Sequence, residues 1–251
     1  MISTVTLAGT PGAPMLVVGP SLGTSVTALW GECARTLGRH FHVIGWDLPG
    51  HGSNTEGVTA CSIPDLAHAV LAALDGPFVY AGDSVGGAVG LQLALLAPVR
   101  LRSVAVLCTG AKIGERSAWL ERAATVRATG TQAVIDSSRQ RWFAPGFIDD
   151  QPQIAGPLLE SLAAADATSY AAVCEALADF DLREQLPTIG TPILAIGGAH
   201  DIATPPEKQR EIADGVQNGR VSILPDIAHL APAEAPDTVA WLLEQHFLDV
   251  D

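Results

Sequence analysis

The sequence has few charged residues, and basic residues are the scarcer kind. Among 251 residues there are 14 Lys and Arg against 27 Asp and Glu, which gives a formal net charge of -13 at pH 7. A surface of this sign repels phosphate backbones and anionic lipid headgroups, so we exclude nucleic acids and anionic membranes as partners. A small anionic ligand is not excluded, because the local charge inside a pocket decides its binding.

Cysteines and long apolar runs are scarce as well. The four cysteines (Cys33, Cys61, Cys108 and Cys174) are scattered without CxxC or metal-ligand spacing, which is typical of reduced core thiols in a cytoplasm. No apolar run reaches the roughly 18 residues of a membrane span. The N-terminus lacks the basic-then-apolar pattern of a secretory signal. We therefore expect a cytoplasmic protein that does not enter a membrane.

What the sequence does contain is a rhythm of short apolar runs separated by helical segments. Apolar residues make up 48% of the chain and charged residues 16%, which favours a large buried core. Strands alternating with helices of this length predict a mostly parallel, doubly wound sheet. The expected strands are residues 5–7, 15–18, 41–46, 78–81, 104–108, 192–196 and 221–224, and the expected core helices are residues 26–37, 62–74, 88–96, 206–213 and 236–246.

This rhythm is interrupted in the middle of the chain. Residues 111–186 contain no β-rich run, and Ala, Glu, Arg and Leu recur there at helical spacing. We interpret this segment as a helical cap inserted between two strands of the sheet. The predicted α/β core then comprises residues 1–110 and 187–251.

The most informative stretch lies between the expected strand 78–81 and the helix that follows it. Gly82, Ser84 and Gly86 form a Gly-x-Ser-x-Gly pattern at this junction, which is typical of a nucleophile elbow. The turn is so sharp that only glycines fit beside it. The serine oxygen is thereby exposed, and the amide of Val85 faces it from the helix N-terminus. The pattern predicts Ser84 as a nucleophile and Val85 as an oxyanion donor.

Two later loops contain residues that would activate such a serine. Asp201 follows the strand ending at residue 196, and His229 follows the strand ending at residue 224. The carboxyl ends of parallel strands gather ligand groups at one edge of a sheet. An imidazole can take the serine proton near neutral pH, and a carboxylate fixes its tautomer and stabilises the imidazolium.

Each of these residues also has a purely structural interpretation. His229 could cap the last helix, and Asp201 could form an Asx turn before Pro205. Asp226 is a competing carboxylate, although it lies only three residues from His229 and would have to curl back within the same loop. The occurrence of Ser84, Asp201 and His229 in this order at strand ends favours the catalytic interpretation.

Several further segments carry a resemblance to a known family. They are residues 21–24 with Trp30, 47–52, 82–87, 109–114 with Trp119, 124–127, 141–143, 179–183 and 200–206. Over its full length the chain resembles the α/β-hydrolase family, and within it the 3-oxoadipate enol-lactonases. The resemblance implies an α/β-hydrolase fold with an inserted helical cap. It also implies a serine hydrolase that opens the enol lactone of 3-oxoadipate in aromatic-compound catabolism (the β-ketoadipate pathway), without a metal or organic cofactor.

The resemblance also implies further site residues. It assigns the amide of Leu22 as the second oxyanion donor beside that of Val85. A small anionic lactone carries a free carboxylate, so a cationic group is expected on the cap. The candidates for contact with the substrate are Arg141, Trp142, Arg127 and Lys112. The alternative is that Arg141 is a solvated helix residue and Trp142 a residue of the cap core.

The chain departs from the family pattern at three positions. Pro20 replaces the usual histidine of a His-Gly turn, Lys112 replaces a common arginine, and Asp83 stands before the serine, where an apolar residue is more usual. Two other functions stay open: a general carboxylesterase or other small-ester hydrolase, and a non-catalytic ligand receptor. The complete Ser, His and Asp set argues against the receptor. The serine at the elbow argues against a haloalkane dehalogenase, whose nucleophile is Asp. The sequence makes no prediction of oligomeric state.

Overall fold

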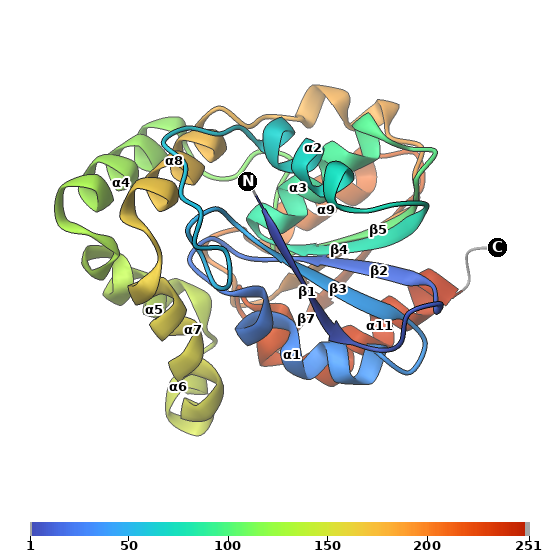
Figure 1. Ribbon diagram of the computed structural model, residues 1–251, viewed down its shortest axis with the longest axis horizontal. Coiled ribbons are helices and arrows are strands. Elements are labelled where there is room, and N and C mark those ends of the chain that lie inside the picture. Colours follow the sequence, from blue (N-terminus) through green and yellow to red (C-terminus); the bar gives the residue numbers. More distant parts are fainter. Residues whose placement is uncertain (1, 249–251) are drawn as a thin grey trace.

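A seven-stranded sheet forms the centre of the molecule in the computed structural model, which describes residues 2–248 (Figure 1). Its strands are β1 (Ser3–Ala8), β2 (Met15–Gly19), β3 (His42–Asp47), β4 (Phe78–Asp83), β5 (Leu101–Leu107), β6 (Ile193–Gly198) and β7 (Gly219–Leu224). They follow the order β1-β3-β2-β4-β5-β6-β7. Only β1 runs antiparallel to its neighbour, β3, and all other pairs are parallel. The mostly parallel sheet predicted from the sequence is confirmed.

Helices cover both faces of this sheet. They are α1 (Val26–Leu37), α2 (Ile63–Ala73), α3 (Val85–Leu96), α9 (Pro206–Gly215), α10 (Ala231–Glu234) and α11 (Pro236–Leu248). Figure 1 shows α1 and α11 on one face and α2 and α3 on the other. Because both faces are covered, every residue of β4 and β6 is buried, which explains their continuous apolar sequence.

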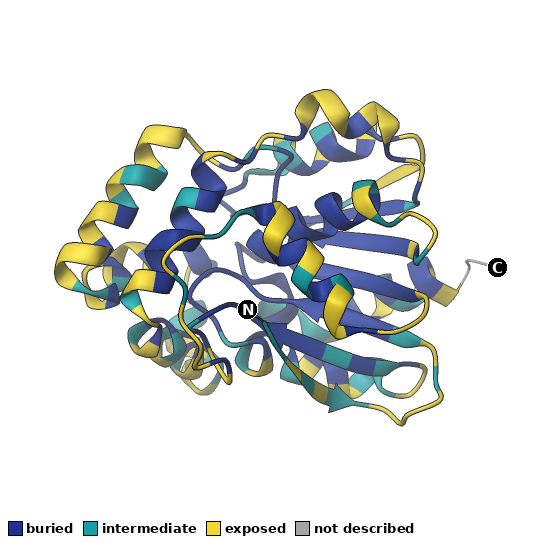
Figure 2. Cartoon of the chain, turned by 45° about the horizontal axis from the view of Figure 1, so that its top comes forward, coloured by how far each residue is buried: buried dark blue, intermediate teal, exposed yellow. Residues whose placement is uncertain are grey.

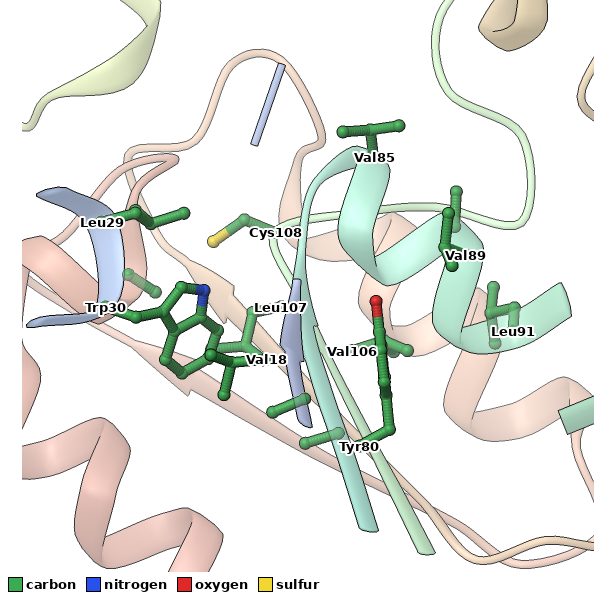
Figure 3. Packing of buried hydrophobic residues seen from close by; sticks show 14 of the residues in the cluster. Val18, Leu29, Trp30, Tyr80, Val85, Val89, Leu91, Val106, Leu107 and Cys108 are labelled. Carbon is green, nitrogen blue, oxygen red and sulfur yellow. The ribbon is translucent and has the colours of Figure 1, made fainter. Parts of the chain in front are cut away.

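Two large aromatic residues pack on opposite faces of the central strands. Tyr80 lies beside the helix that carries Val85 and Val89, and Trp30 lies across the sheet from it (Figure 3). Both are fully buried. The Tyr80 hydroxyl donates a hydrogen bond to the carbonyl of Gly86 at 2.9 Å, and Trp30 Nε1 donates to the carbonyl of Gly19 at 2.9 Å. These aromatic side chains therefore fill the core and also fix the backbone at the end of β2 and in the first turn of α3.

Two hydrogen bonds between side chains and backbone amides fix the start of α2. The Ser62 hydroxyl accepts a hydrogen bond from the Asp65 amide at 3.2 Å, and the Asp65 carboxylate accepts one from the Ser62 amide at 2.9 Å. This reciprocal pair is a capping box. Ser62 is therefore the N-cap of the helix that was predicted over residues 62–74.

All elements between β5 and β6 are helical. They are α4 (Arg116–Thr129), η1 (Thr131–Val134), α5 (Ile135–Trp142), α6 (Phe147–Asp150), α7 (Pro152–Ala164), α8 (Ala167–Ala178) and η2 (Arg183–Thr188). Helices α4 to α8 lie together beyond one end of the sheet, at the left of Figure 1. Their outer surfaces are exposed, whereas the central strands of the sheet are buried (Figure 2). The bounds of the cap, residues 111–186, stay a prediction.

The structure also shows the state of the cysteines and whether any helix could cross a membrane. No helix within residues 2–248 is both long and apolar enough to cross a bilayer. All four cysteines are free, and Cys33, Cys108 and Cys174 are buried. Burial, the largest influence on the Cys174 thiol, raises its pKa to about 12. These three cysteines are protonated core residues.

Candidate active site

Ser84 lies at a strained turn between β4 and α3. Its φ of 52° is positive, a conformation that costs energy in a residue other than glycine. The Ser84 amide donates to the Leu107 carbonyl at 2.8 Å, which holds the turn against β5. A Cβ atom at Gly82 would lie 2.2 Å from the carbonyl oxygen of Gly86. The glycines of the motif are therefore required by the close approach of the backbone on either side of the serine.

The strand ends bring Ser84, Asp201 and His229 together. His229 Nε2 lies 3.0 Å from Ser84 Oγ, and His229 Nδ1 lies 2.8 Å from Asp201 Oδ2. All three side chains are buried, and each follows a different parallel strand: β4, β6 or β7. The competing carboxylate, Asp226, is exposed and makes no hydrogen bond to His229. The histidine therefore bonds to Asp201, the partner expected from the sequence.

Asp201 is held as a carboxylate by its surroundings. Oδ1 accepts hydrogen bonds from the amides of Ala203 at 2.8 Å and Thr204 at 2.9 Å, and Oδ2 accepts one from the Thr204 hydroxyl at 2.7 Å. Burial opposes ionisation, but the charge of His229 and these hydrogen bonds together hold the pKa of Asp201 below its ordinary value. The Asx turn that competed with the catalytic interpretation is present. It is formed by the same Asp201 carboxylate that bonds to His229, so the two interpretations are compatible.

An ionised Asp201 determines the tautomer of His229. A carboxylate only accepts hydrogen bonds, so the hydrogen-bond network assigns the imidazole proton to Nδ1. The lone pair on Nε2 is then directed at the Ser84 hydroxyl. In this arrangement the imidazole can take the serine proton, and the neighbouring carboxylate can stabilise the imidazolium that results.

Two backbone amides lie beside the serine. Val85 is the first residue of α3, so its N–H has no partner within the helix. Leu22 and Ser84 line the same cavity, and the Gly86 amide holds the Leu22 loop close by donating to the Pro20 carbonyl at 2.9 Å. Neither the Leu22 amide nor the Val85 amide donates a hydrogen bond to another described residue. Two free donors of this kind can hold the negative charge that develops on a carbonyl oxygen when Ser84 attacks the carbonyl carbon.

The serine opens into a cavity of about 190 Å³. One side is formed by loops at the ends of strands and the other by the cap. The strand-end residues are Ser21, Leu22, Ser84, Ile202, Ala203 and His229, and the cap-side residues are Ile113, Gly114, Glu115, Ala118, Trp119, Arg122, Arg141, Trp142 and Tyr170. The largest side chains on the cap side are aromatic or cationic, so the cavity combines apolar walls with positive charge.

Two arginines of the cap wall bond only to neutral oxygens. Arg141, on α5, is half-buried, and its Nε donates to the Ser137 carbonyl at 3.2 Å. Arg122, on α4, donates to the Tyr170 hydroxyl and to the Ser138 hydroxyl, both at 2.9 Å. Neither pairs with a carboxylate of the described residues. Burial and the charge of Arg122 lower the pKa of Arg141. This wall is therefore suited to receive an anion.

Lys112 and Arg127 do not line the cavity. Lys112 Nζ lies 3.3 Å from a carboxylate oxygen of Glu115, and Arg127 pairs with Glu175 on the cap surface. Arg127 follows Arg122 by five residues in α4, which turns it about 140° around the helix axis. The structure therefore does not place these two candidates with Arg141 and Trp142, which both line the cavity.

Arg122 and Tyr170 are site residues that the sequence analysis missed. Trp119 and Arg122 are three residues apart in α4, on one helix face, and both line the cavity. That spacing could have identified Arg122. Tyr170 belongs to α8, and its hydroxyl accepts the hydrogen bond from Arg122. Its place in the wall depends on how α4 and α8 pack, which no local pattern shows.

Asp83, the departure from the family pattern, lies inside the core. The residue is fully buried, and neither carboxylate oxygen has a hydrogen-bond partner within residues 2–248. Burial, followed by the charges of Asp201 and Glu234, raises the pKa of Asp83 well above its ordinary value, against an opposing effect of the Ser21 hydroxyl. Asp83 does not line the cavity. The surroundings of Asp83 therefore favour the protonated acid, in contrast to those of Asp201.

The fold and the site define the class of protein. A mostly parallel sheet, a serine at a strand-to-helix elbow, and a Ser, Asp, His order at strand ends are the features of an α/β hydrolase. A model of the Alpha/beta hydrolase family matches residues 13–240. The chain belongs to the alpha/beta hydrolase family, and the resemblance expected from the sequence is confirmed. Within residues 2–248, no group of three or more His, Cys, Asp or Glu could hold a metal ion.

Its similar relatives include enol-lactonases. The chain is 35% identical over 240 residues to 3-oxoadipate enol-lactonase 2 of Acinetobacter baylyi, which covers 94% of this chain and 89% of that one. It is 30% identical to 3-oxoadipate enol-lactonase 1 of the same organism, over 93% and 88% of the two chains. The crystal structure of the enol-lactonase from Burkholderia xenovorans LB400 superimposes with a TM-score of 0.94 at 30% identity, over 99% of this chain and 96% of that one.

Proposed function

We propose that this hydrolase opens the enol lactone of 3-oxoadipate with Ser84 as its nucleophile. The observation that carries the proposal is the composition of the cavity. A hydrogen-bonded Ser84–His229–Asp201 chain and two arginines without carboxylate partners line or adjoin the same small space. An ester hydrolase whose substrate bears a free carboxylate needs both features. The similarity to enol-lactonases supports the same substrate.

In the first half of the proposed reaction, Ser84 becomes acylated. His229 Nε2 takes the proton of the Ser84 hydroxyl while the serine oxygen attacks the lactone carbonyl carbon. The ring C–O bond then breaks, and its electron pair leaves on the enolate oxygen. The imidazolium returns its proton to the leaving group, which tautomerises to a ketone. Asp201 stabilises the imidazolium during these steps.

The developing negative charge lies on the former carbonyl oxygen. The amides of Leu22 and Val85 are the donors that would bind it, because both are free and both lie beside Ser84. One donor of this kind typically lowers the barrier by about 3 kcal/mol. The elbow geometry thereby serves two purposes, since it exposes the serine and presents the first amide of α3.

In the second half, water releases the product. The water oxygen attacks the acyl carbon while His229 takes a proton from the water. His229 then gives that proton to Ser84 Oγ as the bond between Oγ and the acyl carbon breaks. The sum is one lactone and one water converted to open-chain 3-oxoadipate. All proton transfers use Nε2 of the histidine, so no organic cofactor is part of the proposal.

The free carboxylate of the substrate is assigned to Arg141. Its terminal guanidinium nitrogens have no partner among residues 2–248, whereas the nitrogens of Arg122 already bond to hydroxyl groups. Arg122 contributes positive charge behind it. The rings of Trp119 and Trp142 provide apolar contact for the lactone ring. The same fold supports many ester hydrolases, so the anion contact is what separates a lactonase from a general carboxylesterase.

The test measures kcat/KM of purified protein for the enol lactone, followed by its ultraviolet absorbance, and for a neutral aryl ester. Wild type should prefer the lactone, and Ser84→Ala should lose both activities. Arg141→Met keeps the apolar stem but removes the charge. Since a hydrogen bond to a charged group contributes about 1.5–3 kcal/mol, this variant should lose roughly ten- to a hundredfold on the lactone and little on the ester.

The matched control is Arg139→Met, an exposed arginine on the same helix that does not line the cavity. It should leave both activities unchanged. Equal losses on both substrates in Arg141→Met would make Arg141 structural. A wild type that prefers the neutral ester would instead support the carboxylesterase.

A further inference from the structure

Glu234 bonds to the backbone on both sides of His229. It is the last residue of α10, the short helix that follows the histidine loop. Its Oε1 accepts hydrogen bonds from the amide of Ala228 at 3.0 Å and from the amide of Leu230 at 3.3 Å. These two residues are the immediate neighbours of His229. One carboxylate oxygen therefore fixes the backbone that carries the histidine.

The second oxygen of Glu234 bonds to the cap. Oε2 accepts a hydrogen bond from the amide of Ala144 at 2.8 Å. A second hydrogen bond joins the same two segments with donor and acceptor exchanged, because the His229 amide of the core donates to the Trp142 carbonyl of the cap at 3.2 Å. Residues 142–144 of the cap and 228–230 of the core are thus joined by hydrogen bonds, three of which end on Glu234. Trp142, the first residue of this cap segment, and Arg141, which precedes it, line the cavity.

The carboxylate has only backbone amides as partners. Within the described chain, no Lys or Arg forms an ion pair with Glu234. Burial raises the pKa of Glu234 to about 7, and the three amides and the charge of His229 oppose this shift. A group that only stabilised the surface would gain more from an exposed cationic partner. A carboxylate without one, placed where two separate segments meet, is suited to align them.

We propose that Glu234 is a positioning residue, which sets the orientation of His229 and the position of the cap segment 142–144 through one carboxylate. This rests on the proposed serine mechanism but not on the identity of the substrate. General-base transfer needs the imidazole and the hydroxyl within hydrogen-bond reach. Since the His229 side chain contacts Ser84 at 3.0 Å, a shift of the loop by about 1 Å would slow proton transfer by up to roughly a hundredfold.

The test is Glu234→Gln, which has nearly the same shape. A glutamine amide offers one oxygen acceptor, and its NH2 group only donates. The glutamine oxygen can therefore accept from the amides of the His229 loop or from the Ala144 amide, but not from both. On the side that loses its acceptor, the glutamine NH2 group would face a backbone N–H, so that two donors would meet. The primary readout is the second-order rate at which a fluorophosphonate labels Ser84, because labelling reports activation of the serine whatever the natural substrate is.

We expect the fluorophosphonate to label Ser84 roughly ten- to a hundredfold more slowly in Glu234→Gln than in wild type. Its kcat should fall by a similar factor on the enol lactone and on a neutral aryl ester, with KM changed less than about threefold. Glu234→Asp keeps two acceptor oxygens on a shorter side chain and should recover part of the rate. The control, Glu175→Gln, breaks the surface pair with Arg127 and should label at the wild-type rate.

Wild-type labelling and kcat in Glu234→Gln, with only a lower melting temperature, would overturn the proposal. So would a loss confined to KM for the anionic lactone, because the cap alone would then have moved. If Glu234→Gln does not fold, the same comparison on Glu234→Asp decides, with wild-type labelling as the contradicting result. Slow labelling in a protein that does not open the lactone would keep this proposal and reject the proposed substrate.

Discussion

The two sides of the cavity are built differently. On the sheet side, the polar groups of Ser84, Asp201 and His229 bond to one another, and each residue lies in the turn or loop that follows a strand. On the cap side, Arg122 and Arg141 bond only to neutral oxygens, and they come from separate helices. The sheet side is preorganised for one kind of chemistry. The cap side presents charge to whatever enters, so changes there should alter the choice of substrate rather than the reaction.

The largest effect should come from breaking the sheet side at Asp201. In Asp201→Asn the amide can donate to the histidine, which reverses the tautomer and removes the lone pair that faces Ser84. A loss of roughly 10⁴-fold in kcat is expected from this change, and it should be equal for the enol lactone and a neutral aryl ester. Steady-state kinetics on both substrates provide the measurement.

Asp226→Asn is the matched control for this experiment. Asp226 lies in the same loop as His229 but is exposed and does not contact it. Activity should stay at the wild-type level. A large loss in Asp226→Asn together with a small one in Asp201→Asn would show that the histidine changes partner in solution.

The same contrast explains what could be predicted from the sequence. Ser84, Asp201 and His229 could be identified because each lies in the turn or loop after a strand, and the glycines around Ser84 are required by the local backbone. Helix α1 (Val26–Leu37) has the bounds expected from its apolar spacing. These are signals within a few residues of the chain.

The cap wall has no comparable local signal. Arg127 was a reasonable candidate by its place in a family-like segment, but the helix turns it away from the cavity and toward Glu175. Tyr170 joins the wall only because α8 packs against α4. The contacts of Glu234 with Ala144 likewise join segments far apart in the sequence. Such contacts follow from tertiary packing, which the spacing of residues along one helix does not reveal.

A smaller effect should follow from Arg122→Met, which weakens the positive charge of the cap wall. Arg122 already bonds to the hydroxyls of Tyr170 and Ser138, so it acts on an anion mainly through its charge. A contribution of about 1 kcal/mol gives a roughly fivefold lower kcat/KM for the enol lactone. The neutral ester should be unaffected.

The control for Arg122→Met is Arg116→Met. Arg116 lies on the same helix, pairs with Asp179 at 3.0 Å and is exposed. Arg116→Met should leave kcat/KM unchanged for both substrates. A similar loss on the lactone in the two variants would mean that general surface charge, and not the wall of the cavity, attracts the substrate.

The last effect concerns stability rather than activity, and it compares two carboxylates within the sheet side itself. Asp201 and Asp83 are both buried, but hydrogen bonds and His229 hold the pKa of Asp201 down, whereas burial without partners raises that of Asp83. The pKa of Asp83 is thus higher in the folded than in the unfolded protein, where it is about 3.9. Above that pH, folding requires Asp83 to take up a proton, so its contribution to the free energy of unfolding falls as pH rises toward the folded pKa.

Asp83→Asn removes this proton uptake while keeping the size of the side chain. Near pH 4 the variant and the wild type should be about equally stable, because the protonated acid and the amide are similar neutral groups. The variant should become more stable than wild type as the pH rises, and the difference should grow by up to about 1.4 kcal/mol for each pH unit between the unfolded and the folded pKa. Urea unfolding at pH 5, 6.5 and 8 measures the difference. A gap that does not change with pH would mean that Asp83 is ionised in the folded protein and has found a partner there, because only a raised pKa makes the gap grow in this direction.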